Sequence, residues 1–171
     1  ISDPGFMLSR ECRRAGIDVV CLPGATAFVP AIVSSGLPCD RFVFEGFLPP
    51  KKGRLTRLRM LAADARTCII YESPKRLPAT LRQLAEVFGP ERQAAVCREI
   101  SKLHETVHKG TLDELDRFFQ QNNPRGEIVI VIEGSDGHRA ADSDKVSVPE
   151  NTASRPLSKY ARKRMEMESD S

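Results

Sequence analysis

A short apolar strand that runs directly into a basic connector rich in proline and glycine constrains this chain more than any other segment. Strand and connector occupy residues 36–54, and the strand carries Phe42, Phe44 and Phe47 at a spacing that suits one buried face. Two prolines and a glycine follow within residues 49–53, where they prevent any regular element from continuing. The segment therefore predicts a joint between two domains.

The composition excludes few classes of protein. The 171 residues carry 26 basic and 23 acidic side chains, a net charge of +3, so nucleic-acid binding must be argued from where the charges cluster. No apolar run is long enough to cross a bilayer, and the length allows one ordinary domain or two compact ones. The five cysteines are odd in number and scattered. They predict reduced, mostly buried thiols in a cytoplasmic protein rather than disulfides or a zinc site.

Helices and strands are expected to alternate along the first 134 residues. Apolar spacing and capping residues predict helices over residues 4–15, 25–35, 54–64, 74–87 and 112–121. Short β-branched or apolar runs predict strands over residues 18–22, 42–47, 67–71, 93–100 and 127–133. This alternation predicts the α/β class. Residues 135–171 contain no Phe, Ile or Trp and are expected to form a polar, disordered tail.

Residues 104–108 match the H-E-x-x-H pattern of zinc proteases, which requires both histidines on one face of a helix. Thr111 and Glu114 form a capping-box pattern that starts the next helix only after the motif. The intervening residues, Thr106 and Val107, favour extended backbone. The sequence therefore predicts no metal site.

Two segments are candidates for ligand binding. Residues 23–27 form a predicted strand-to-helix turn, where free backbone N–H groups allow close approach of a carboxylate or a ribose. Tyr71 ends a buried strand, at the edge of the sheet where open α/β folds bind ligands, and it is placed to cover an adenine. A plain turn, and a capped helix start with a solvated Lys75–Arg76 pair, remain the alternatives.

Charged residues gather at two places. Glu99 lies at a strand end between Arg98 and Lys102, where it would stay ionised and could accept or orient a proton. A structural network of ion pairs is the alternative. The second group surrounds the joint, where it offers either a track for RNA phosphates or simply a solvated face. Its members are Lys51, Lys52, Arg54, Arg57 and Arg59.

A resemblance to a known family rests on six short sequence motifs and on the order in which they follow one another. They are Pro23-Gly24-Ala25-Thr26-Ala27, Gly36-Leu37-Pro38, Phe44-Glu45-Gly46-Phe47-Leu48-Pro49, Tyr71-Glu72-Ser73-Pro74, Arg98-Glu99 and Gly126-Glu127. In these motifs the chain resembles the small-subunit ribosomal RNA methyltransferase I family, a branch of the tetrapyrrole methylase-like, class III methyltransferases. The resemblance covers roughly residues 1–134.

The resemblance implies two α/β domains with a cofactor cleft between them. Residues 1–47 would be the C-terminal remainder of the first domain, residues 48–134 the second domain and residues 135–171 the tail. Because the family has further sequence before the position of Ile1, the chain is expected to be a fragment whose first domain is incomplete.

The resemblance also implies S-adenosylmethionine as cofactor and 2′-O-methylation of a cytidine in small-subunit (16S) ribosomal RNA. The partner would be that RNA or the 30S subunit, and the enzyme would be a cytoplasmic homodimer. The implied cofactor contacts are Pro23, Gly24, Thr26, Ala27, Tyr71, Arg98, Gly126 and Glu127.

Glu99 is the candidate catalytic residue, and the candidate RNA contacts are Lys51, Lys52, Arg54, Arg57 and Arg76. Two alternatives stay open. One is a tetrapyrrole methyltransferase with the same fold and methyl donor. The other is a noncatalytic RNA-binding fragment, which would bind RNA in a salt-sensitive way without cofactor affinity.

Overall fold

Within residues 5–122 and 124–135, which the computed structural model describes, five helices and five strands form a mixed α/β fold. The helices are α1 (Gly5–Arg14), α2 (Phe28–Ser35), α3 (Arg54–Ala62), α4 (Leu77–Phe88) and α5 (Leu112–Gln121). The strands are β1 (Phe42–Phe47), β2 (Thr67–Glu72), β3 (Gln93–Arg98), β4 (Thr106–Thr111) and β5 (Ile128–Ile132). The predicted α/β class is confirmed. Of the predicted tail, only Ser135 lies inside the described residues.

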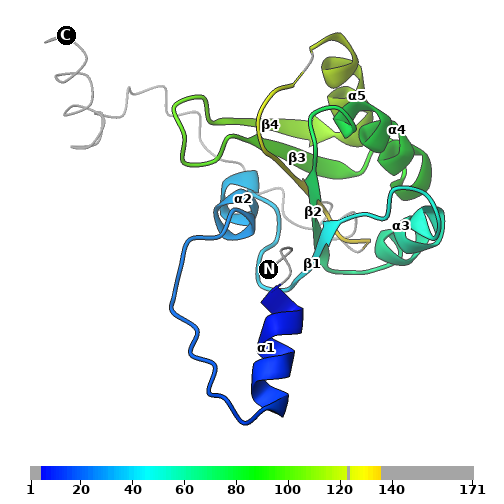
Figure 1. Cartoon of the computed structure of the whole chain (residues 1–171). Helices are drawn as coiled ribbons and strands as arrows, with labels where there is room; N and C mark the ends of the chain where they lie inside the picture. Colours follow the sequence, from blue (N-terminus) through cyan, green and yellow to red (C-terminus); the bar gives the residue numbers. More distant parts are fainter. Residues whose placement is uncertain (1–4, 123, 136–171) are drawn as a thin grey trace, which may run out of the picture.

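All five strands belong to one sheet with the order β1-β2-β5-β3-β4 (Figure 1). β1 and β2 are parallel, whereas β5 is antiparallel to both of its neighbours, β2 and β3. β2 and β3 therefore run in the same direction. In consequence the carboxyl ends of β1, β2 and β3 meet the amino end of β5 at one edge of the sheet.

The two faces of the sheet are covered unequally. One face, with Ile70, Val96 and Ile130, packs against α3, α4 and α5 in a large apolar core. Each fully buried leucine or isoleucine there contributes roughly 1.5–3 kcal/mol. Of the described helices, only α2 packs against the other face, which carries Ile69 and Val131 (Figure 1). A single short helix leaves part of this second face open for a site.

A β-bulge explains how the three phenylalanines of β1 share one face. Phe44 pairs with Ile69 and Phe47 pairs with Tyr71, because the register shifts between Phe44 and Gly46. Gly46 has a φ of 69°, a left-handed conformation that glycine adopts without strain. Strict alternation would have turned Phe47 to the opposite face. The shared face is as predicted but it is only partly buried, because Phe42 stays 37% and Phe47 53% exposed.

The predicted strand over residues 18–22 is wrong, and residues 23–27 are therefore not the predicted strand-to-helix turn but an irregular segment before α2. Val20 and Leu22 are each 80% exposed, and no strand of the described chain pairs with this segment. β-branched composition alone cannot hold a strand, because its backbone groups need a neighbouring strand. α1 likewise buries no residue, and this part of the chain extends away from the sheet (Figure 1).

The remaining predicted elements are present, with shifted ends. α2 begins at Phe28 rather than at residue 25, and α4 begins at Leu77 rather than at residue 74. The residues before α4 form a turn in which the Leu77 N–H donates to the Ser73 carbonyl at 3.0 Å. β4 was not predicted as a strand. The Thr111 capping box of α5 is confirmed, because Thr111 and Glu114 bond each other's backbone N–H groups.

Two of the five cysteines are buried, two are exposed and Cys12 is intermediate between them. Cys68 and Cys97 are buried, as predicted, and burial raises the pKa of Cys68 to about 12 and that of Cys97 to about 11. For Cys21 and Cys39 the prediction is wrong, because both are exposed. Cys21 lies in the segment that does not form the expected strand.

The predicted division between residues 47 and 48 stays a prediction. Residues on both sides of it contribute strands to the same sheet, since β1 ends at Phe47 and pairs with β2. No helix in the described part of the chain is long and apolar enough to span a membrane.

Candidate functional site

A cavity of about 410 Å³ opens at the edge of the sheet where β2 and β3 end and β5 begins. Ala27 before α2, Tyr71 of β2, Ile100 after β3 and the pair Gly126–Glu127 before β5 all line it. Most of the exposed lining is apolar, and the volume falls in the range of small-molecule sites. The strand directions thus bring four distant segments of the chain to one hollow.

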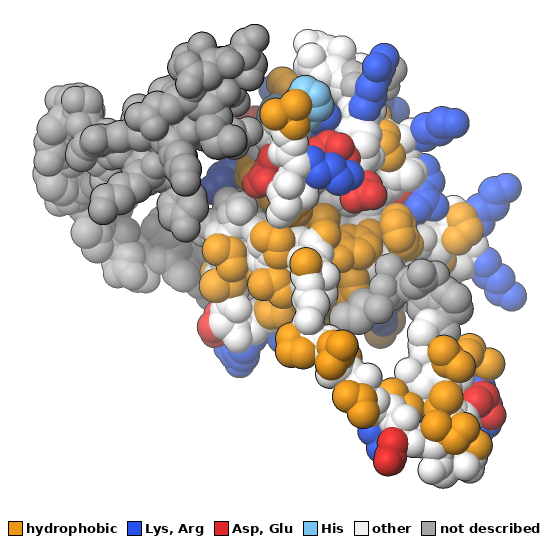
Figure 2. All heavy atoms as spheres, turned by 60° about the vertical axis from the view of Figure 1, so that its left-hand side comes forward, with side chains coloured by type: hydrophobic (Ala, Val, Ile, Leu, Met, Phe, Trp, Pro, Cys, Tyr) orange, Lys and Arg blue, Asp and Glu red, His pale blue; other side chains and the backbone are white. Residues whose placement is uncertain are grey.

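A second cavity, of about 430 Å³, adjoins the first. It is lined by residues 24–27 and by Ser101, and it shares Ala27 and Ile100 with the first cavity. Figure 2, which turns the α2 side of the molecule forward, shows hydrophobic side chains gathered beside a group of acidic and basic ones. The two cavities are therefore neighbours with a shared wall, and the charged residues Glu72 and Glu127 line the first of them.

Six of the eight predicted cofactor contacts line these cavities. Tyr71, Gly126 and Glu127 line the first, Gly24 and Thr26 line the second, and Ala27 lines both. The two others, Pro23 and Arg98, do not line either cavity.

Tyr71 supplies an aromatic wall. Its ring centroid lies 4.9 Å from that of Phe44 and 5.7 Å from that of Phe47, both at steep angles typical of edge-to-face contacts. Phe28 of α2 stacks on Phe44 at 4.7 Å. Partial burial raises the pKa of the Tyr71 phenol. The side chain is therefore a neutral, fixed ring at physiological pH.

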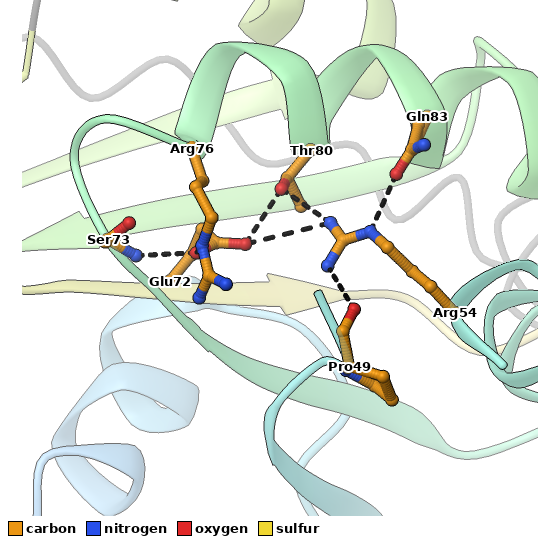
Figure 3. A network of polar contacts seen from close by, with 7 residues as sticks. All are labelled: Pro49, Arg54, Glu72, Ser73, Arg76, Thr80 and Gln83. Carbon is orange, nitrogen blue, oxygen red and sulfur yellow. Dashed lines mark hydrogen bonds and ion pairs between the residues drawn. The ribbon is translucent and has the colours of Figure 1, made fainter. Parts of the chain in front are cut away.

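The carboxylate of Glu72, next in sequence, is completely buried and bound on several sides (Figure 3). Oε1 accepts hydrogen bonds from the Ser73 N–H at 2.7 Å and from Nε of Arg76 at 2.7 Å. Oε2 accepts the Thr80 hydroxyl at 2.8 Å and lies 3.8 Å from Nη2 of Arg54. Sequence reasoning assigned Glu72 no role. The signal that could have indicated a buried, hydrogen-bonded carboxylate is the position of this glutamate between a buried strand and the start of a helix.

Arg54 is a poor candidate for RNA contact, because its side chain is buried (Figure 3). Its guanidinium donates to Gln83 Oε1 at 2.8 Å, to the Pro49 carbonyl at 3.3 Å and to the Thr80 hydroxyl at 2.7 Å. These bonds tie the start of α3 to α4 and to the joint. Arg54, which the sequence predicted to lie on a basic surface, instead forms hydrogen bonds inside the fold.

The other candidate RNA contacts differ in their partners. Arg57 forms two hydrogen bonds with Glu45, at 2.7 and 2.6 Å, and the hydrogen bond raises the pKa of its guanidinium. Arg76 is paired with Glu72. Lys51 and Lys52 are exposed on the joint. The two lysines, together with the exposed Arg59, are therefore the members of the group best placed to meet a phosphate.

Glu99 takes part in the ion-pair network that was the alternative to a proton-transfer role. Its Oε1 accepts the Glu127 N–H at 2.7 Å and the Lys102 ammonium at 2.9 Å. The hydrogen bond from the Glu127 backbone, followed by the one from Lys102, lowers the pKa of Glu99. The role of proton acceptor stays a hypothesis.

Arg98 holds loops rather than facing either cavity. Its guanidinium donates to the Thr106 hydroxyl at 3.1 Å, to the Arg125 carbonyl at 3.3 Å and to the His104 carbonyl at 3.1 Å. These bonds connect the loop after β3 with the loop before β5.

The H-E-x-x-H residues do not lie on a helix. Residues 104–105 belong to a loop, and β4 begins at Thr106. His108 packs against Phe118 of α5 with ring centroids 4.6 Å apart, and burial lowers the pKa of its imidazole. With His104 in a loop and His108 in a strand, the two histidines lack the close i,i+4 placement on a helix that the zinc motif needs.

Comparison with known proteins agrees with this geometry. Residues 1–116 match the family model of the tetrapyrrole (corrin/porphyrin) methylases. A ribosomal RNA small subunit methyltransferase I from Mycobacterium tuberculosis is 45% identical over 155 residues, 90% of this chain and 54% of the relative. The relative of that name from Escherichia coli O157:H7 is 44% identical over 147 residues, 84% of this chain and 50% of its own length. The chain thus spans about half the length of these curated relatives.

Solved structures share the fold at low sequence identity. A cobalt precorrin-4 methyltransferase aligns with a TM-score of 0.58 at 16% identity, covering 76% of this chain and 58% of its own. A uroporphyrin-III-C-methyltransferase from Thermus thermophilus aligns with a TM-score of 0.56 at 21% identity, covering 83% and 62%. On the match over residues 1–116, the chain belongs to the tetrapyrrole methylase family.

Proposed function

We propose that the protein containing this chain is an S-adenosylmethionine-dependent methyltransferase that methylates the ribose 2′-hydroxyl of a cytidine in small-subunit ribosomal RNA. The observation that carries the proposal is the cavity beside Tyr71, in a chain 44–45% identical to relatives named ribosomal RNA small subunit methyltransferase I. The proposed partner is that RNA or the 30S subunit, in the cytoplasm.

The residues present suit the methyl donor. The cavities offer an aromatic ring, Tyr71, and backbone groups of the irregular segment before α2, residues 24–27. An adenine would lie against the ring, and backbone N–H groups of the segment before α2 would bind a carboxylate or a ribose. Gly24, Thr26, Ala27, Gly126 and Glu127 would supply the remaining walls. Pro23 would shape the segment before α2 without contact, and Arg98 would hold the neighbouring loops.

The reaction requires little covalent chemistry from the protein itself. Bound S-adenosylmethionine supplies an activated methyl group on a sulfonium. The chain's own residues orient the donor and exclude water, which brings the accepting hydroxyl within reach for an in-line transfer. A carboxylate whose pKa is lowered and whose Oε1 accepts two hydrogen bonds, as in Glu99, is a weak general base. The proposal therefore does not depend on Glu99 as proton acceptor.

The joint gives the RNA a route to the cavity. Lys51 and Lys52 are exposed a few residues after Phe47, which itself lines the first cavity. Phosphate contacts at the two lysines would position the substrate without reading its sequence. A homodimer belongs to the same proposal. Exposed apolar side chains on α1 and α2, among them Phe6 and Val33, are suited to such an interface.

The test is transfer of labelled methyl groups from S-adenosylmethionine to unmodified 30S subunits by the complete reading frame that contains this chain. Alkali-resistant dinucleotides carrying label would establish ribose methylation, because a 2′-O-methyl group blocks cleavage of the adjacent phosphodiester.

Two other outcomes would replace the proposal. Donor binding without label in the RNA, but with label in uroporphyrinogen, would identify a tetrapyrrole methyltransferase. Salt-sensitive RNA binding with no donor binding would leave a noncatalytic RNA-binding module.

A further inference from the structure

The loop after β3 holds two residues in a conformation that side chains disfavour. Glu99 has a φ of 53° and Ser101 a φ of 64°, both in the left-handed region. Neither is glycine, asparagine or aspartate, the residues that adopt this region most readily. Such backbone persists only where the surrounding structure compensates for it, and it gathers at sites that require a fixed geometry.

The compensation comes from the loop before β5. The Glu99 N–H donates to the Glu127 carbonyl at 3.0 Å, and the Glu127 N–H donates back to Oε1 of Glu99 at 2.7 Å. Lys102 then bridges the pair, with its Nζ 2.9 Å from Glu99 Oε1 and 3.2 Å from Glu127 Oε2. Both loops are thus closed onto each other by backbone and side-chain bonds together. We call this arrangement the Glu99 clamp.

Gly126 fits the same clamp from the other side. Its φ is 85°, and a Cβ at this position would overlap the carboxyl group of Glu99. The glutamate therefore occupies the space that any other residue at position 126 would need. Two positions 27 residues apart in the chain are matched in shape.

The clamp borders the proposed donor site. Ile100, adjacent to Glu99, lines both cavities, and Gly126 and Glu127 line the first. Arg98, on the other side of Glu99, also holds the loop before β5 through the Arg125 carbonyl. Consecutive residues at the end of β3 thus fix the position of one wall of the cavity.

We propose that Glu99 is a positioning residue, which holds Gly126 and Glu127 in place as a wall of the methyl-donor pocket and thereby sets the affinity for the donor. The inference rests on the proposed function, and it differs from the proton-acceptor hypothesis in what it predicts. A general base acts on turnover, whereas a clamp acts on donor binding through pre-organisation.

Two substitutions separate these roles. Glu99→Gln keeps an amide oxygen that can accept the Glu127 N–H, whereas Glu99→Ala removes the acceptor altogether. For a clamp, Glu99→Ala raises the Kd for S-adenosylhomocysteine by about tenfold or more, and Glu99→Gln raises it by less. For a base, both variants lose turnover alike while the Kd stays unchanged.

The experiment measures that Kd by calorimetry and hydrogen exchange of the Glu127 amide, in the complete reading frame that contains this chain. Glu114→Ala is the matched control. Glu114 also accepts a backbone N–H, that of Thr111 at 2.8 Å, but on α5, which packs against the opposite face of the sheet. We expect Glu99→Ala to speed exchange at Glu127 by about tenfold and the control to leave both exchange there and the Kd unchanged.

Unchanged exchange at Glu127 in Glu99→Ala, or faster exchange with an unchanged Kd, would overturn the inference. If Glu99→Ala does not fold, the nearly isosteric Glu99→Gln tests the inference instead. A smaller rise in both the Kd and the exchange rate at Glu127 is then expected, and no change in either would overturn the inference. Absence of S-adenosylhomocysteine binding to the unmodified protein would refute the proposed function. Hydrogen exchange of the Glu127 amide would then be the sole test of whether Glu99 holds the loop before β5 in place.

Discussion

Nη2 of Arg54 lies 3.8 Å from the buried carboxylate of Glu72, and the Thr80 hydroxyl bonds to both side chains. The contact joins the start of α3 to the end of β2 and to α4, beside the first cavity. A cation that looks available for RNA in the sequence is therefore needed inside the fold.

Replacing Arg54 by methionine should destabilise the protein. We expect Arg54→Met to lower the free energy of unfolding by about 2–3 kcal/mol, because it leaves a buried carboxylate with one partner fewer. Urea denaturation followed by circular dichroism measures the change. Arg59→Met, an exposed position on the same helix, is the control. Equal effects of the two variants would contradict a bracing role for Arg54.

Replacing Lys51 and Lys52 together by alanine should weaken RNA binding with little effect on stability. Each phosphate contact contributes about 0.7 to the slope of log affinity against log salt for single strands, so two lost contacts should reduce the slope by about 1.4. Filter binding to small-subunit RNA over a salt series measures the slope. Arg117→Ala, at a cation paired with Asp113 on α5, should leave the slope unaltered. An unaltered slope in the lysine variant would exclude the joint as an RNA contact.

Tyr71 should matter for the donor through its ring rather than its hydroxyl. Tyr71→Ala should raise the Kd for S-adenosylhomocysteine by about 5-fold to 150-fold, the loss of about 1–3 kcal/mol of base stacking. Tyr71→Phe keeps the ring and its contacts with Phe44 and Phe47, so the Kd should change little. Calorimetry distinguishes the two variants. A loss as large in the phenylalanine variant would assign the affinity to the hydroxyl instead.

Asp64 should make stability depend on pH in the acid range. Hydrogen bonds from the Arg66 side chain, and then from its backbone N–H, lower the pKa of Asp64 from 3.8 to about 2. A lowered folded-state pKa stabilises the fold above pH 3.8, and this contribution is lost as the pH falls from about 4 to about 2.

The difference in denaturation midpoint between the unmodified protein and Asp64→Asn should therefore shrink over that interval. Its size will be modest, because Arg66 is half exposed and solvent screens the pair. A difference that stays constant from pH 5 to pH 2 would contradict the assignment.

Elements marked by local patterns could be predicted from the sequence. β2 is a continuous apolar run, and α5 starts at a capping box, so neither depends on knowledge of distant residues. The placement of β5 between β2 and β3 could not be predicted, since strand order is decided by contacts far apart in the chain. The error at residues 18–22 has the same origin, because a strand exists only with a partner.

The site shows the same limit. Tyr71 could be located because it lies at the end of a predicted strand, whereas residues 24–27 line the cavities without the strand that the prediction placed before them. The partners of individual charges could not. Arg54 and Lys52 look alike in the sequence, yet one is buried against Glu72 and the other is exposed. Charge pairing is a tertiary property, and a run of basic residues does not reveal which of them face inward.

Because Cys68 and Cys97 lie on opposite faces of the sheet, labelling of their thiols can report local opening of each face separately. Cys68 faces the three-helix side, whereas Cys97 faces α2 and its Sγ lies 3.6 Å from the Ala31 carbonyl. Thiol reagents attack the thiolate, so Cys21 and Cys39 should be modified first while both buried thiols stay inert. Later labelling of Cys97 would time the departure of α2, and labelling of Cys68 the opening of the larger core. One reagent could thus record whether the two sides of the sheet unfold together or in turn.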